Sequence, residues 1–89
     1  MTAQILKIVN EKGLHARASA KFVEVVEAHD ASAEVSKDGM TVSGDSIMGL
    51  LMLAASRGTS IEVRTSGAQA GDLSQALQAL VANRFGEDR

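Results

Sequence analysis

The apolar residues of this 89-residue chain switch repeatedly between the alternation of strands and the spacing of helices. Strand patterns occupy residues 4–9, 33–35, 41–43 and 60–65, and helical patterns occupy residues 16–28, 47–52 and 73–81. This order predicts a β-α-β-β-α-β-α chain. Because the strands keep one polar face, we expect an α+β fold in which helices cover one side of a single sheet.

Local signals mark the ends of these segments. Asp38-Gly39 is typical of a hairpin turn, and Arg57-Gly58 ends the second helical segment. Ser46 has the character of a helix N-cap. Asp72 and Gln75 have the spacing of a capping box for the last helix, although that helix could already begin at Ala70. Residues 83–86 close it. The predicted core comprises Leu6, Ile8, Phe22, Val23, Val26, Val35, Ile61, Val63, Leu77, Leu80 and Val81.

Length and composition exclude several classes of protein. A chain of 89 residues with 45% apolar residues and a net charge of −2 predicts one folded domain, residues 1–89. No apolar run is long enough for membrane insertion, and residues 1–4 do not resemble a secretion signal, so we expect a cytoplasmic protein. Without cysteine, disulfides and thiolate chemistry are excluded. No nucleic-acid surface, metal site or cofactor motif is predicted.

His15 is the residue that most suggests chemistry. It stands between Gly13 and Arg17, where a loop enters a helix. Histidine is a poor N-cap, whereas a helix N-terminus attracts anions such as phosphate. A neutral imidazole can act as a nucleophile, and the guanidinium of Arg17 could bind phosphate oxygens. The pattern indicates phosphate chemistry; the alternative is an exposed loop histidine with an incidental arginine.

The other candidates have simpler readings. His29 lies at a predicted helix end, where its charge would complement the helix dipole, so we assign it a structural role. Ser46 is explained as a helix cap, although a phosphoserine would also be tolerated there. The segment that follows is apolar on nearly every side. Some of its side chains should therefore be exposed as a docking patch; ordinary core packing is the alternative. These side chains are Ile47, Met48, Leu51 and Met52.

Residues 13–18, Gly-Leu-His-Ala-Arg-Ala, resemble the active-site motif of HPr, the histidine-containing phosphocarrier of the phosphoenolpyruvate-dependent phosphotransferase system. Residues 46–51 resemble the regulatory-serine segment of the same family, and the similarity covers essentially the whole chain. The resemblance implies an open-faced sandwich, with a four-stranded antiparallel sheet and three helices on one face.

The resemblance also implies a function. His15 would accept a phosphoryl group from phospho-enzyme I on Nδ1 and pass it to a histidine of an enzyme IIA domain, and Arg17 would contact the phosphate. Ser46 would be the site of an ATP-dependent HPr kinase/phosphorylase. The protein would be a monomeric carrier rather than a free-standing enzyme. The implied docking residues are Ala16, Ala20, Ile47, Met48 and Leu51.

Two further points follow from the resemblance. Ala18 replaces the proline of most family members, which leaves the fine geometry of the site open. Residues 50–53 and 58–63 also resemble the nitrogen-related NPr branch, which favours a regulatory relay over sugar transport. Two other classes of function stay in view. One is a binding module regulated only through Ser46, and the other is a small-ligand sensor with a concave pocket.

Overall fold

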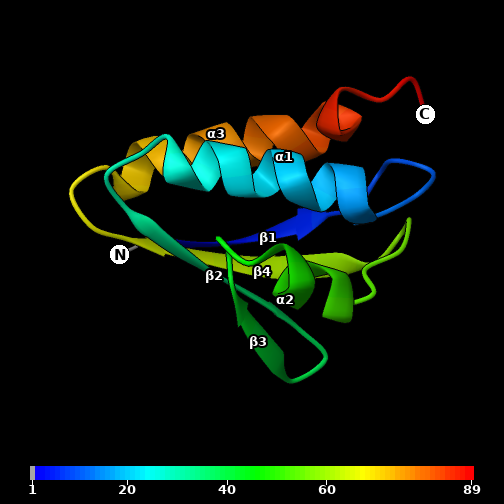
Figure 1. Ribbon diagram of the computed structural model, residues 1–89, viewed down its shortest axis with the longest axis horizontal. Coiled ribbons are helices and arrows are strands. Elements are labelled where there is room, and N and C mark those ends of the chain that lie inside the picture. Colours follow the sequence, from blue (N-terminus) through cyan, green and yellow to red (C-terminus); the bar gives the residue numbers. More distant parts are fainter. Residues whose placement is uncertain (1) are drawn as a thin grey trace.

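The computed structural model describes residues 2–89 and contains one four-stranded sheet with the strand order β1-β4-β2-β3. All three strand pairs are antiparallel. Figure 1 shows α1 and α3 side by side across one face of this sheet. The fold and the predicted order of elements are therefore confirmed. The elements are β1 Thr2–Lys7, α1 Ala16–Glu27, β2 Ser32–Lys37, β3 Met40–Ser43, α2 Ile47–Met52, β4 Ser60–Ser66, α3 Ala70–Ala82 and the 3₁₀ turn η1 Arg84–Gly86.

Alternating burial along the strands shows which face of the sheet is covered. In β4, Ile61, Val63 and Thr65 are buried, whereas the residues between them are at least partly exposed. Ile61 and Val63 belong to one buried cluster with the apolar stripe of α1, which includes Phe22 and Val26. Predicted core positions are confirmed with one exception. Leu80 is only partly buried, because it lies at the edge of the cluster rather than inside it.

The short helix α2 packs against α1 and β3. Gly49 allows its close approach to the sheet, because a Cβ atom there would lie 2.9 Å from the Cβ of Val42. Leu50 is fully buried and attaches the helix to the core. Within residues 2–89, no helix is both long enough and apolar enough to cross a membrane.

The predicted bounds of the first strand are wrong, because the strand runs from Thr2 to Lys7 rather than over residues 4–9. Its pairing with β4 stops at Ser60, since Thr59 turns back to bond Ser56. Ile8 nevertheless stays fully buried, and its backbone N–H donates to the carbonyl of Thr59 at 2.8 Å.

The capping box at Asp72 and Gln75 does not form. The alternative start at Ala70 is confirmed, with Gln69 as N-cap, and the side chain of Gln69 makes no capping bond. Instead it accepts a hydrogen bond from the backbone N–H of Asp30 at 2.6 Å. Asp72 lies in the first turn, where its charge complements the helix dipole. The side chain of Gln69 is therefore used in a tertiary contact and does not cap α3.

Candidate functional site

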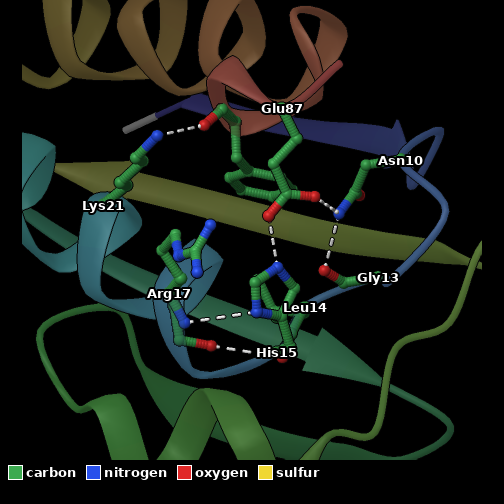
Figure 2. Close-up of polar contacts among 9 residues, drawn as sticks. Asn10, Gly13, Leu14, His15, Arg17, Lys21 and Glu87 are labelled. Atoms are coloured by element: carbon green, nitrogen blue, oxygen red, sulfur yellow. Dashed lines mark hydrogen bonds and ion pairs between the residues drawn. The ribbon is translucent and has the colours of Figure 1, made fainter. Parts of the chain in front are cut away.

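His15 is the N-cap residue of α1, with an extended backbone of φ −78° and ψ −176°. Its Nδ1 atom accepts a hydrogen bond from the backbone N–H of Arg17 at 3.3 Å (Figure 2). The side chain is 26% exposed, so the ring is held at the helix start but stays accessible. This placement at a helix N-terminus agrees with the sequence prediction.

The loop before α1 is held against the segment that follows α2. Gly13 has a φ of +67°, and a Cβ atom there would lie 2.9 Å from the Cα of Ser56. The backbone N–H of Leu14 donates to the carbonyl of Ala55 at 2.9 Å, and the Leu14 side chain is buried. A glycine is therefore required where the two segments touch, and the position of His15 is set by the fold.

The C-terminal segment supplies the part of the site that the sequence did not reveal. Three consecutive residues, Arg84, Phe85 and Gly86, have φ values of 56°, 55° and 79°. Phe85 is fully buried, and the Nζ atom of Lys21 donates to its carbonyl at 2.6 Å. This left-handed turn brings Glu87 to the imidazole of His15 (Figure 2). Only the adjacent pair Phe85-Gly86 could have signalled the turn, and nothing local points to Glu87.

Glu87 joins the ring of His15 to a buried asparagine. Its Oε2 atom pairs with Nε2 of His15, and its Oε1 atom accepts a hydrogen bond from Nδ2 of Asn10 at 3.0 Å. Asn10 is fully buried, and the same Nδ2 atom donates to the carbonyl of Gly13 at 2.8 Å. The contacts at both ring nitrogens are those of a neutral imidazole that carries its proton on Nε2 and a lone pair on Nδ1.

The pKa of Glu87 lies below its ordinary value of 4.5. Burial acts in the opposite direction and raises the pKa, but hydrogen bonds from Asn10 and His15 lower it, and so do the positive charge that His15 carries when it is protonated and the positive charge of Lys12. Glu87 is therefore ionised at neutral pH and presents a carboxylate to Nε2.

A shallow groove beside the ring is lined by charged side chains of both signs, and its carboxylates are Glu11, Glu87 and Asp88. Glu87 lines one part of it, and its wall runs along the exposed start of α1. The cationic residues in the groove are Lys12, Arg17, Lys21 and Arg89. Together with the N–H groups at the start of α1, they could bind the oxygens of a phosphoryl group. Ala18, where the family pattern has proline, is fully buried and does not enter the groove.

Ser46 lies at the start of α2. Its backbone is extended, with φ −114° and ψ 109°, and its Oγ atom accepts a hydrogen bond from the N–H of Gly49 at 3.0 Å. The predicted N-cap is confirmed. His29 also has the structural role expected of it, because its Nδ1 atom is hydrogen-bonded to the carbonyl of Val25 at 2.8 Å.

The apolar segment around α2 divides between core and surface. Leu50 and Leu53 are buried, whereas Met48 is 70% and Met52 63% exposed. The exposed members form what we call the α2 patch, which consists of Ile47, Met48, Leu51 and Met52. The exposure is as predicted, and the docking role stays a prediction. Of the two predicted docking residues on α1, Ala16 is exposed and Ala20 half-buried.

Comparison with known proteins identifies related chains. A family model described as "PTS HPr component phosphorylation site" matches residues 2–83. The phosphocarrier protein HPr of Neisseria meningitidis serogroup A is 45% identical over 87 residues, 98% of each chain. The phosphocarrier protein NPr of Escherichia coli is 35% identical over 86 residues, 96% of each chain. The crystal structure of HPr-C-His from Thermoanaerobacter tengcongensis matches with a TM-score of 0.94 and 32% identity, covering 100% of both chains.

Proposed function

This chain belongs to the HPr family of phosphocarrier proteins, and from that premise we propose that His15 carries the phosphoryl group. In this proposal, Nδ1 of His15 accepts the group from phospho-enzyme I and passes it to a histidine of an enzyme IIA domain. The protein acts as a single monomeric domain in the cytoplasm and alternates between two partners.

The observation that carries this proposal is the state of the His15 ring. Nε2 is occupied by Glu87, whereas Nδ1 faces the N-terminus of α1 and has a lone pair. That lone pair gives up its hydrogen bond from the N–H of Arg17 and attacks phosphorus, and the bond between phosphorus and the donor breaks with its electron pair returning to the donor. The transfer onward repeats these steps with Nδ1 as the leaving atom. Arg17 and the N–H groups of α1 offset the phosphoryl charge throughout.

The shape of the site supports transfer between proteins rather than binding of a small ligand. A ligand sensor needs an enclosed, largely apolar pocket, whereas the groove beside His15 is shallow and lined mostly by charged side chains. A module that works only through Ser46 would not need the bonds that orient His15. Both alternatives are therefore less well supported than the carrier.

We assign docking to the α2 patch with Ala16 and Ala20. Exposed apolar clusters mark interaction sites, and methionine side chains adapt to more than one partner surface. Ser46 begins the same helix, so a phosphoryl group on it would place negative charge beside the patch. We therefore propose Ser46 as a regulatory site for an HPr kinase/phosphorylase.

The phosphoryl acceptor defines the branch of the family. Faster transfer to a nitrogen-type enzyme IIA than to a sugar-type enzyme IIA would support the regulatory relay that residues 50–53 and 58–63 favour. The reverse preference would place the protein in sugar transport. The assay needs the phosphorylated protein and one purified enzyme IIA of each type.

The decisive test of the carrier is phosphorylation by enzyme I. The protein is incubated with phosphoenolpyruvate, Mg²⁺ and an enzyme I that phosphorylates a reference HPr, and its mass is then measured intact. We expect one acid-labile phosphate on the wild type and on His29→Ala, and none on His15→Ala. His29 is the matched control because it is the chain's only other histidine. Phosphate that persists in His15→Ala, or is missing from the wild type, would overturn the proposal.

A further inference from the structure

We propose that Glu87 is a positioning residue that keeps the imidazole of phosphorylated His15 protonated on Nε2 and thereby sets the lifetime of the phosphoryl group. This inference rests on the proposed function, because it assumes that Nδ1 carries phosphate. It concerns a different property, which is the pH range over which the phosphorylated ring stays reactive.

The contacts of Glu87 show that its carboxylate is held in place rather than resting on the surface. Its side chain is 14% exposed and bonds both His15 and Asn10. The amide of Asn10 directs Nδ2 at Glu87 and at the carbonyl of Gly13, which leaves its own buried Oδ1 atom without a hydrogen-bond partner in residues 2–89. An unpaired buried oxygen is costly. Asn10 nevertheless keeps the orientation in which its Nδ2 atom donates to Glu87.

The turn before Glu87 is also costly. Arg84 and Phe85 adopt left-handed backbone angles, which are strained for residues that carry a side chain. Full burial of Phe85 and the bond from Lys21 to its carbonyl hold the turn in this conformation. A tail with no role at the ring would not need strained residues to reach it.

The chemistry of a phosphorylated imidazole explains what the carboxylate does. When Nδ1 of the Nε2–H tautomer attacks phosphorus, the ring gains the N–P bond and becomes positively charged. Glu87 then accepts a hydrogen bond from Nε2–H and opposes that charge. On transfer, the electron pair of the N–P bond returns to Nδ1, and the ring leaves as a neutral imidazole with its Nε2 proton in place.

Loss of the Nε2 proton would change the leaving group. A deprotonated ring would have to leave as an imidazolate anion, which is a far poorer leaving group, so transfer and hydrolysis would both slow. By stabilising the protonated ring, Glu87 extends fast transfer to higher pH. Neighbouring cations oppose it and neighbouring carboxylates assist it. The other charged groups that line the groove next to Glu87 are Glu11, Lys12, Arg17, Lys21, Asp88 and Arg89.

The test uses chemical phosphorylation with phosphoramidate, so it does not depend on enzyme I. The hydrolysis rate of the phosphorylated protein is followed by ³¹P NMR as a function of pH. We expect Glu87→Gln, which removes the charge but keeps the shape, to move the midpoint of the profile about one pH unit lower. Asp88→Asn, which removes the same charge from the next residue, should leave the midpoint within a few tenths of a unit of wild type.

A second measurement reports on the unphosphorylated ring. The ¹⁵N shifts of His15 should show the Nε2–H tautomer in wild type and Asp88→Asn, and a mixture of tautomers in Glu87→Ala, with thermal unfolding confirming that each variant is folded. An unchanged midpoint in Glu87→Gln, or an equal shift in Asp88→Asn, would overturn the inference. Failure of enzyme I to phosphorylate the wild type would instead overturn the carrier, so the two failures are distinct.

Discussion

The starts of α1 and α2 use one device for two different purposes. At each, the N-cap side chain accepts a hydrogen bond from a backbone N–H of its own helix. Ser46 bonds the third residue along at 3.0 Å, whereas His15 bonds the second at a longer 3.3 Å. Serine is among the best N-caps, and histidine is not. The weaker cap begins the longer helix, of 12 residues against 6.

The difference lies in what else holds each side chain. The side chain of Ser46 is held by its bond to Gly49, three residues along the same helix. The helix α2 itself is attached to the core through Leu50. His15 is oriented from both sides, by Arg17 within its helix and by Glu87 from the other end of the chain. The side chain of Ser46, which serves as a cap, is therefore oriented by its own helix. The side chain of His15, to which we assign the reaction, is oriented by the tertiary structure as well, and its capping bond is secondary.

Removal of the phosphate-binding side chain at the start of α1 should impair phosphotransfer more than any other change considered for the two helix starts. Arg17→Ala should slow phosphorylation by enzyme I about 10- to 100-fold, because a charge-assisted hydrogen bond contributes roughly 1.5–3 kcal/mol. Arg17→Lys should recover part of the rate. Stopped-flow or quench-flow phosphotransfer measures the effect.

Arg64→Ala is the matched control, since Arg64 is an exposed arginine of β4 that pairs with Glu62. Its rate should equal that of the wild type. A wild-type rate in Arg17→Ala would mean that the start of α1 binds phosphate without its arginine.

A charge at the start of α2 tests the other side of the comparison. Ser46→Asp keeps a good N-cap but adds negative charge beside the α2 patch, so affinity for enzyme I should fall about tenfold through charge mismatch and desolvation. Calorimetric or surface-based binding measures the change. Ser60→Asp adds the same charge at the exposed start of β4 and should bind like the wild type. Undiminished binding by Ser46→Asp would remove the regulatory proposal.

Features encoded locally could be predicted from the sequence. The spacing of apolar residues located α1 to within one residue at its C-terminal end, and β4 to within one residue. The hairpin at Asp38-Gly39 and the cap at Ser46 each depend on residues within a few positions of one another. His15 and Arg17 could be singled out for the same reason, because they lie two residues apart.

Features that depend on distant residues could not be predicted. The partner of His15 lies 72 residues away in sequence, and it arrives through a left-handed turn with no glycine at its first two positions. The predicted capping box of α3 does not form for a related reason, since Gln69 at the helix start is hydrogen-bonded to Asp30 from another part of the chain. Neither helix and strand propensity nor residue spacing predicts such contacts. His15 and Arg17 could therefore be predicted from the sequence, whereas Glu87 could not.

Removing the cap hydroxyl of Ser46 should have a smaller effect. Ser46→Ala leaves the N–H of Gly49 without its acceptor and should lower the free energy of unfolding by about 1 kcal/mol. Ser46→Asn should restore most of it, because asparagine is an equally good N-cap. Denaturant unfolding of the three proteins measures both. A loss in Ser46→Ala that asparagine does not restore would show that Ser46 stabilises α2 by something other than capping.

The smallest expected effect concerns the pH dependence of stability at the start of α1. Because the pKa of Glu87 is lower in the folded protein than its ordinary 4.5, its contribution to stability is present above pH 4.5 and is lost as the pH falls through the folded value. The difference in unfolding free energy between wild type and Glu87→Gln should therefore shrink as the pH falls below 4.5. Denaturant unfolding at several pH values between 3 and 7 measures it.

Ser46 has no ionisable group, so Ser46→Ala should show a difference from wild type that does not vary over this range. A pH-independent difference for Glu87→Gln would mean that charge does not hold the carboxylate of Glu87 at His15. The two helix starts would then differ only in the lengths of their cap bonds, 3.3 Å at His15 and 3.0 Å at Ser46.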